Sequence, residues 1–512
     1  MAQIPLRLTL TSTGFPFLSE KQGRTIIIPG LDITGKSSAV IDPNLAVPEI
    51  YYGHNIVPTA QGFQAAALST LVAAPVDTLN DFTQVLTIRD SAGNKVYLAT
   101  CDSGRNYILR HLSQGWKRTD DILPAVSGRL VTTAYINGIT YIYFEKIGCY
   151  TYDVSANTLN WVTLSGLVPA QIKGIVAAAG YLLAYSNTYM YWSSTLTPVD
   201  FTPSIITGAG GGAVQDLKGA ITIVFPHRVG VTIYSTYNIV MGYYSGNIRF
   251  PFSFKEIVGS GGVSSNRHMD IDPVSGDHYA YTTGGVQLVT PTVTNGVFPE
   301  LTDFLAGLYF EDFDENTNTF TTTSLTTQMV KRITSISDRY VIFSYGTGLA
   351  GTHFTYAVVY DVSLQRFGKL KLPHVDCFEY VLLDTDIVDN AKNSIGFLQL
   401  DGTVVLTSLS AVTDTANGVL LLGKFQVARQ NTVDLEQLVI ENVRPTATFS
   451  VTCLSSIDGK NISTSKAGYL IPSTGLVRDY RFRSSGMNHS LLFKGAFDLV
   501  SILSYWGLGG YR

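Results

Sequence analysis

Residues 129–164 read RLVTTAYINGITYIYFEKIGCYTYDVSANTLNWVTL, and this stretch decides the fold class. Apolar and polar side chains alternate along each short run, which is typical of half-buried β-strands. Asn137–Gly138 separates the first two runs and favours a two-residue hairpin, because both turn positions need a positive φ. Gly148 begins a third run, and Ser155–Asn157 leads into a fourth that ends at Trp161. Four antiparallel strands within about 36 residues match the size of one β-propeller blade.

A weak internal repeat indicates more than one such blade. The segment TYDVSANTLNWVTL (151–164) returns as VYDVSLQRFGKLKL (359–372), with the tetrapeptide YDVS identical. In each copy an aromatic residue precedes an Asp that can cap the next turn with its own carboxylate. The segment DIDPVSGDHYAYTTGGVQLV (270–289) has the same strand–turn–strand pattern. The repeat favours a propeller and, taken alone, leaves a sandwich or a large barrel open.

The composition is that of an all-β protein. The 512-residue chain is 45% hydrophobic and only 14% charged, with 29 Tyr and 25 Phe. Few charges favour strands over long helices, because long helices need Glu, Lys and Arg on their exposed faces. One short helix is expected in QGFQAAALSTLVAAP (61–75), ending at Pro75. We therefore predict an all-β fold, a β-propeller with a C-terminal β-sandwich domain.

Changes in character along the chain predict three regions. Residues 1–45 are expected to form N-terminal strands or an arm, and residues 46–425 the propeller. A Thr-rich, acidic insertion at about 298–330 interrupts the blade rhythm, and a long polar insertion has to lie at the surface as a loop or hairpin. From 426 to 512 the strands are longer and richer in Arg, which predicts a separate small β-sandwich.

Charge is scarce and unevenly placed. The formal net charge is −4, so no overall positive field attracts nucleic acid. Residues 268–330 hold nine Asp and Glu and no Lys or Arg, whereas residues 424–512 hold ten basic and six acidic residues. Such segregation in a chain with few charges predicts that different parts of the protein face different partners.

The cysteines and the hydropathy of the sequence predict a protein that is neither stabilised by disulfide bonds nor inserted in a membrane. The cysteines at 101, 149, 377 and 453 are scattered without a CxxC pair, so we expect free thiols in a reducing cytoplasm. The N-terminal residues alternate polar and apolar instead of forming the apolar core of a signal peptide. The longest apolar stretch, 174–185, is shorter than the roughly 20 residues that a membrane span needs.

One nucleotide-binding motif is present by pattern only. GLDITGKS (30–37) satisfies G-x-x-x-x-G-K-[ST] and follows a strand-like run. A P-loop also needs a helix that begins at its Lys and directs its N-terminus at the phosphates. Pro43 and Pro48, with β-branched residues before them, forbid that helix. We interpret the motif as a turn between two strands and predict no cofactor.

Metal-binding and catalytic patterns are also incomplete. Asp312, Asp314 and Asn316 alternate as in a calcium loop, but Thr317 stands where Gly is needed and Thr323 where a bidentate Glu is needed. A looser surface cation site remains open, and a solvated acidic face is the commoner explanation. The eight His residues are scattered, without HExxH, and GxSxG is absent. We predict no catalytic residue, no metal site and no enzyme activity, with a propeller glycosidase left open by fold analogy alone.

Six segments, taken in chain order, carry a family resemblance. They are RTIIIPGL (24–31), GIVAAAGYLLAYSNTYMYWSSTLTPVDF (174–201), GAITIVFPHRVGVTIYSTYN (219–238), AVVYDVSLQRFGKL (357–370), VDLEQLVIENVRPTATFSVTCLSSIDGKN (433–461) and RDYRFRSSGMNHSLLFKGAFDLVSILSYW (478–506). In this order they resemble the tail hub or nozzle proteins of short-tailed bacteriophages (podoviruses), also called packaged-DNA stabilisation proteins. Together they touch about half of the chain.

The resemblance implies a structural virion protein, assembled in the host cytoplasm and located in the tail. Six propeller protomers would form a ring beneath the portal and adaptor proteins, extend the DNA channel, retain packaged DNA and carry tail spikes or fibres. Genomic double-stranded DNA would pass through without sequence-specific binding, and a wall with few charges suits this because basic residues would hold phosphates. The alternatives are a phage receptor-binding or polysaccharide-degrading tail protein with a propeller fold, and a bacterial carbohydrate-binding propeller.

The acidic insertion is the first candidate site. Its densest part consists of Glu311, Asp312, Asp314 and Glu315. These carboxylates repel one another, which is tolerable at an exposed end of a ring. We expect them near the distal opening of the channel, where six copies would form a negative collar that repels DNA. A docking loop for a fibre and a cation site are the competing interpretations.

The basic C-terminal region is the second candidate site. The residues that would face an adjoining protein ring are Arg444, Arg478, Arg481 and Arg483. Exposed strand positions often carry Arg with no further role, and that interpretation is equally open.

Overall fold

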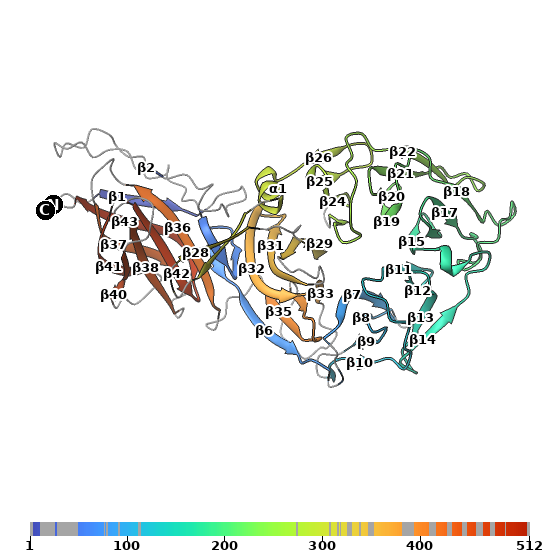
Figure 1. The fold of residues 1–512 in the computed structure, drawn as a ribbon, viewed down its shortest axis with the longest axis horizontal. Coiled ribbons are helices and arrows are strands. Elements are labelled where there is room, and N and C mark those ends of the chain that lie inside the picture. Colours follow the sequence, from blue (N-terminus) through green and yellow to red (C-terminus); the bar gives the residue numbers. More distant parts are fainter. Residues whose placement is uncertain are drawn as a thin grey trace.

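The computed structural model describes residues 4–10, 26–27 and 50–508, apart from 76, 78–79, 91–92, 111–113, 273–274, 307–308, 315–316, 318, 325–329, 337–338, 347–352, 381–393, 409–415, 427–432, 443–447, 457–463, 472–476 and 487. In these residues the chain is almost wholly β-structure, and Figure 1 shows a ring of sheets joined to a second unit of packed strands. The predicted fold class, a β-propeller with a C-terminal β-sandwich, is confirmed.

Seven four-stranded antiparallel blades form the propeller within the described residues; six are separate sheets, and blade 6 is the end of a longer sheet that continues into the sandwich. The first strand of each blade lies nearest the centre of the ring (Figure 1). Blades 1 to 3 are β7 (Phe82–Arg89), β8 (Lys95–Cys101), β9 (Asn106–Leu109) and β10 (Lys117–Arg118); β11 (Val131–Ile136), β12 (Ile139–Phe144), β13 (Gly148–Asp153) and β14 (Thr158–Val162); and β15 (Gly174–Ala178), β16 (Tyr181–Tyr185), β17 (Tyr189–Trp192) and β18 (Gly210–Ala213).

The remaining blades follow in chain order. Blades 4 and 5 are β19 (Ile221–His227), β20 (Gly230–Ser235), β21 (Ile239–Tyr244) and β22 (Phe252–Glu256), then β23 (Met269–Ile271), β24 (His278–Thr282), β25 (Gly285–Val289) and β26 (Thr294–Gly296). Blades 6 and 7 are β29 (Val330–Ile336), β30 (Tyr340–Gly346), β31 (Phe354–Asp361) and β32 (Arg366–His374), then β33 (Asp376–Tyr380), β34 (Ser394–Leu398), β35 (Val404–Ser408) and β6 (Ala67–Val72).

Blade 2 has the strands and turns that its sequence predicts. The β11–β12 hairpin pairs Ile136 with Ile139, and the two residues between them, Asn137 and Gly138, have φ values of 52° and 81°. Strand β13 begins at Gly148, and the turn into β14 has Asn157 at a φ of 55°. The local signals suffice here because an Asn-Gly turn fixes the register of the alternating strands on both sides.

The repeated YDVS tetrapeptide occupies equivalent places in two blades, between the third and fourth strands. In blade 2 Asp153 Oδ1 accepts hydrogen bonds from the backbone and hydroxyl of Ser155. In blade 6 Asp361 Oδ1 accepts the same pair from Ser363. The third predicted copy differs, because its Asp272 caps the turn between the first and second strands of blade 5. That copy shares the turn chemistry and not the position in the blade.

Blade 7 closes the propeller with a strand from the N-terminal side. Strand β6 pairs antiparallel with β35, and Ala67 faces Ser408. The helix predicted for 61–75 is therefore wrong, because this segment forms β5 (Phe63–Ala65) and β6. An Ala-rich run has only a weak intrinsic preference, and the hydrogen-bonding edge of β35 overrides it.

The sandwich draws its strands from both ends of the chain. One sheet contains β43 (Asp498–Leu508), β37 (Val433–Asn442), β41 (Val477–Gly486), β40 (Tyr469–Ile471) and β1 (Ile4–Thr9). The other contains β36 (Gly418–Gln426), β42 (Asn488–Gly495), β38 (Phe449–Ser456), β39 (Thr464–Ala467), β2 (Ile26–Ile27) and β3 (Ile50–His54). The predicted region 426–512 therefore supplies most of the sandwich, and strands from before residue 55 and from 418–426 complete it.

A continuous sheet joins the sandwich to the propeller. Strand β4 (Ile56–Pro58) pairs with β32 of blade 6 and with β5, and β5 pairs with β43. One hydrophobic core accordingly includes residues of both units, among them Phe343 of blade 6 and Trp506 of the sandwich. Burial on both sides of the junction stabilises one arrangement of the two units.

The segment 298–330 contains a helix and a hairpin. Helix α1 (Pro299–Ala306) buries Leu301 and Leu305 against the shared core. Strands β27 (Tyr309–Asp314) and β28 (Thr319–Ser324) pair antiparallel. In Figure 1 the label of β28 lies toward the sandwich end of the molecule. None of the helices in the described part of the chain has the length and apolar character needed to cross a membrane.

The two equivalent Asp turns offer a matched test of this fold. Asp361 is buried and its Oδ2 lies 2.8 Å from Nε of Arg339, whereas Asp153 caps an exposed turn. We expect Asp361→Ala to lower the free energy of unfolding by about 2–3 kcal/mol, because it removes turn bonds and an ion pair together. Asp153→Ala should cost clearly less. Urea unfolding of both variants measures this, and equal losses would contradict the assigned difference in burial.

Candidate functional site

Five exposed large apolar side chains lie on two neighbouring loops of blades 3 and 4. This apolar rim patch consists of Leu196, Ile205 and Ile206 on the β17–β18 loop and Ile248 and Phe250 on the β21–β22 loop. Exposed fractions range from 54% for Ile248 to 90% for Ile206. The loops touch, since a Cβ added at Gly208 would lie 2.7 Å from Cγ2 of Ile248. Blades 3 and 4 lie far from the sandwich in Figure 1.

Serine hydroxyls hold the β17–β18 loop in shape. Ser194 Oγ accepts hydrogen bonds from the backbone amides of Leu196 and Thr197. Ser204 Oγ accepts them from Ile206 and from the next residue. The exposed apolar side chains therefore stand on ordered turns. Several apolar side chains exposed on neighbouring ordered loops favour an interaction site, because exposing them to water is unfavourable.

A strand edge lies beside the apolar rim patch. Strand β18 is the outer strand of blade 3 and pairs on one side with β17. Val214 N donates a hydrogen bond to Thr188 O, and in the same register Gly212 lies opposite Met190. Hydrogen-bonded pairs alternate with non-bonded pairs along antiparallel strands, so the amide and carbonyl groups of Gly211 point away from β17. An unpaired edge next to apolar side chains can take up a further strand.

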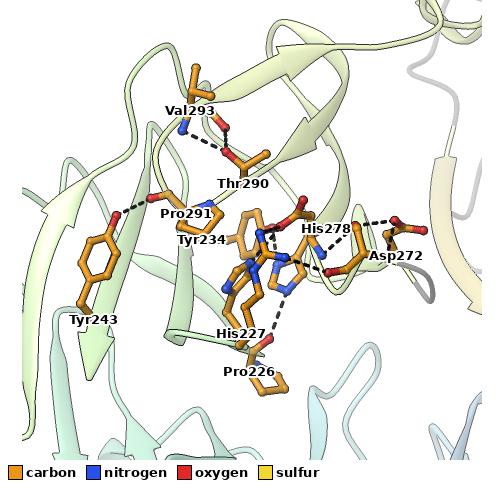
Figure 2. A network of polar contacts seen from close by, with 12 residues as sticks. Pro226, His227, Tyr234, Tyr243, Asp272, His278, Thr290, Pro291 and Val293 are labelled. Atoms are coloured by element: carbon orange, nitrogen blue, oxygen red, sulfur yellow. Dashed lines mark hydrogen bonds and ion pairs between the residues drawn. The ribbon is translucent and has the colours of Figure 1, made fainter. Parts of the chain in front are cut away.

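A buried polar network joins blades 4 and 5 (Figure 2). Tyr234 Oη on β20 donates to His278 Nδ1 on β24 at 2.8 Å, and His278 Nε2 donates to Pro226 O at 3.1 Å. His227 Nε2 lies 3.3 Å from Oδ1 of Asp277. His278 is wholly buried, and these bonds use both nitrogens of its ring. The network is an interior link between blades.

Burial keeps both imidazoles of this network neutral. Desolvation, with a smaller contribution from the neighbouring His227, lowers the pKa of His278 to about 3. The pKa of His227 is also lowered by burial, against the opposing effect of Asp277. Neutral rings suit the hydrogen bonds observed, because His278 Nδ1 must accept a bond from Tyr234.

A cavity of about 340 Å³ lies between the inner strands of blades 1 to 5. Its walls are mostly aliphatic, and Gln84, Asn266, Arg267 and Asp270 supply polar groups. Arg267 precedes β23 of blade 5, and its Nη2 donates to Thr83 O on β7 of blade 1 at 3.1 Å. The arginine thus links two blades that are not neighbours in the ring.

The acidic candidate residues lie on the β27–β28 hairpin. In its register Glu311 faces Thr322, Asp312 faces Thr321 and Asp314 faces Thr319. Asp314 is exposed, and its Oδ1 accepts a bond from the Thr317 amide at 3.4 Å. Glu315 lies outside the described residues, as does Asn316 of the calcium-like pattern.

The basic candidate residues lie mainly on β41 of the sandwich. Arg481 and Arg483 are exposed on one face of the strand, and Arg481 Nη2 lies 3.6 Å from Oδ2 of Asp479. Arg478 is half-buried, and its guanidinium lies 5.0 Å from the ring centre of Phe449. Arg444 lies outside the described residues. The acidic and basic candidates therefore belong to different elements, a propeller insertion and a sandwich strand.

Other sequence motifs have these outcomes. GLDITGKS (30–37) lies outside the described residues. All four cysteines are free, as predicted, and the structure buries them. Burial raises the pKa of Cys149 to about 12 and of Cys453 to about 11. Where the structure describes side chains, no three His, Cys, Asp or Glu residues come together in a group that could hold a metal.

Sequence reasoning missed both the apolar rim patch and the cavity. A signal for the patch exists in TPSIITG (202–208), where two isoleucines stand among turn-forming residues. Loops of this composition seldom carry large apolar side chains unless something covers them. The cavity has no local signal, because five blades contribute to its walls.

Comparisons with known proteins identify no family for this chain. No family model matches the sequence, and no curated protein matches it. Among solved structures 597 chains match. One, described as "YCF48 bound to D1 peptide", has a TM-score of 0.38 and 12% identity, and covers 67% of this chain and 96% of that one. Similarity at this level says nothing about what this chain binds.

The polar network predicts a pH dependence of stability. In the folded state His278 stays neutral down to a pKa of about 3, while in the unfolded chain it takes up a proton below its ordinary pKa of about 6.5. The folded state therefore loses about 2 kcal/mol through this residue between pH 7 and pH 5. The His278→Gln variant lacks this contribution. The difference in the free energy of unfolding between wild type and variant, measured with urea, should therefore be about 2 kcal/mol smaller at pH 5 than at pH 7. An unchanged gap would contradict the neutral, buried imidazole.

Proposed function

We propose that this chain is a structural protein of a short phage tail. Six copies form a ring that extends the channel of the portal and adaptor proteins, retains packaged DNA and carries spikes or fibres. The protein sits in the tail of the virion and performs no catalysis. The alternative is a phage receptor-binding or polysaccharide-degrading tail protein with a propeller fold.

The observation that carries this proposal is the apolar rim patch with its neighbouring strand edge. Ile206 and Phe250 are 90% and 67% exposed on ordered loops, a costly arrangement in a protein that works alone. A ring component must present side surfaces to its neighbours, and obligate interfaces of this type bury more than about 2,000 Å². The resemblance of the sequence to tail hub or nozzle proteins is the reason for proposing that this ring belongs to a phage tail.

We assign a second copy of this chain as the occupant of the apolar rim patch. In a closed ring each protomer offers one surface to the next protomer and a different surface to the previous one. The patch lies on the propeller far from the sandwich, so the sandwich and the β27–β28 hairpin remain available for other proteins. This division matches the segregation of acidic and basic residues along the chain.

The central cavity gives the polysaccharide-degrading alternative no support. Glycoside hydrolysis uses two carboxylates, and sugar-binding sites commonly offer aromatic surfaces. Among the residues lining the cavity, Asp270 is the one carboxylate and Phe225 the one aromatic side chain.

Substitution in the patch tests the assembly. Ile206→Asp introduces a charge at the centre of the expected contact and should lower incorporation into virions about tenfold or more. The matched control is Ile122→Asp on the β10–β11 connection, where an isoleucine is 60% exposed outside the patch. Tail content is measured by quantitative mass spectrometry of particles, and cryo-microscopy should count six copies. Equal incorporation of both variants, or a single copy per particle, would sink the proposal.

Neutralising the hairpin tests the acidic collar. The variant replaces Glu311, Asp312, Asp314 and Glu315 by Gln or Asn. If the hairpin forms a collar, repulsion of DNA phosphates is lost, and DNA retention or the ejection rate changes. A change in fibre attachment or in calcium dependence instead would assign the hairpin to docking or to cation binding. Ejection is followed by dye fluorescence from single particles, with fibre content as the parallel measurement.

A further inference from the structure

We propose that strand β18 of one protomer pairs with strand β6 of the next protomer, so that one β-sheet runs across each contact of the ring. This inference rests on the ring of six copies proposed above and names the backbone contact within it. Two outer blade strands carry it. Both are uncharged, each has a single partner among the described strands, and they lie on different sides of the propeller.

The edge of β18 lacks the usual protection against pairing with another chain. Its sequence, GGGA, contains no charge and no proline, and its register with β17 has no bulge. By the alternation of bonded pairs described above, Ala213 directs its amide and carbonyl groups away from β17, as Gly211 does. Natural sheet edges are commonly protected by charges, prolines or bulges. An edge without any of these, beside exposed apolar side chains, is suited to accept a strand.

Aromatic rings lie close against both faces of β18. A Cβ added at Gly210 would lie 3.2 Å from Trp192 Nε1, and one added at Gly211 would lie 2.7 Å from Tyr189 Cε1. Successive residues of a strand face opposite sides, so the glycines leave room for one ring on each face. A strand added at this edge packs small or aliphatic side chains beside these rings, whereas a charged side chain would lose hydration there.

Strand β6 is the matching edge on another side of the propeller. It is the outer strand of blade 7, and β35 is its one partner among the described strands. No Asp, Glu, Lys or Arg occurs from residue 55 to residue 76. Figure 1 places β6 toward the sandwich and β18 at the opposite side of the propeller. A closed ring needs two different contact surfaces on each protomer, and these two edges supply them.

The other blade edges suit this contact less well. Strands β10 and β22 contain charged residues, and β32 already pairs with β4. The Leu159 amide of β14 donates to Oδ2 of Asp121, and the Thr294 amide of β26 donates to Val258 O. These bonds within the protomer use amides that an added strand would need. Among the described blades, β6 and β18 are therefore the pair that remains.

A proline variant tests whether the backbone of β18 carries the contact. Ala213→Pro removes an outward N–H, so incorporation into virions should fall about tenfold. Ala213→Val keeps the N–H and should be incorporated like the wild type. The lost N–H makes no bond within blade 3, so the unfolding temperature of purified Ala213→Pro should stay close to the wild-type value. Normal incorporation of Ala213→Pro would contradict the proposal.

Cross-linking of introduced thiols tests the pairing without relying on the proline variant. The four native cysteines are buried, so Ala213→Cys and Ala67→Cys place the accessible thiols for a flexible bismaleimide reagent. In virions the double variant should give covalent species up to the hexamer, and each single variant should remain monomeric. Six copies per virion without these species would overturn the strand pairing and leave the ring in place. A single copy per virion would overturn the ring and the pairing together.

Discussion

The pairing of β4 and β5 with their neighbours is the constraint on which the arrangement of this protein depends. Strand β4 bonds to blade 6, β5 bonds to the sandwich, and the two bond to each other. Arg366 lies at this junction, 4% exposed, and its guanidinium bonds to the carbonyls of Thr59 and Leu10 and stacks on Phe63. Burial lowers the pKa of Arg366 to about 10, so it remains charged at neutral pH. A buried cation with two carbonyl partners ties the N-terminal strands to the propeller.

The scarcity of charge shapes the rest of the molecule. Neighbouring blades are joined by apolar contacts between their facing sheets, and a few polar links connect blades, such as the buried bond of Tyr234 with His278 and the half-buried bond of Arg267 with Thr83. Buried polar links of this type specify which surfaces meet, because each donor must find its acceptor. Apolar side chains that the core does not use remain exposed on the rim of blades 3 and 4. The chain therefore combines a well-bonded interior with a surface suited to contact other proteins.

Sequence signals predicted the structure where they are local. The turn at Asn137–Gly138 and the Asp turns at 153 and 361 depend on residues within a few positions, and the structure contains them as expected. The helix predicted for 61–75 is wrong because β35, the strand that pairs with this segment, lies far along the chain and leaves no local signal. The same reason explains the candidate sites: exposure of Ile206 and the position of β18 at the edge of its sheet are tertiary properties, whereas acidic and basic residues are visible in the sequence wherever they lie.

The interleaving of the two units has a consequence for how the chain folds. Strand β1 pairs with β43, so β1 has no partner until the chain has been made as far as β43. Strands β3 and β6 likewise pair with β36 and β35, after most of the propeller has been made. Contacts this distant in sequence slow folding and leave strand edges open to misassembly meanwhile. In the folded protein β1 and β43 hold each other in one sheet, so β1 cannot leave the sandwich without breaking its hydrogen bonds to β43.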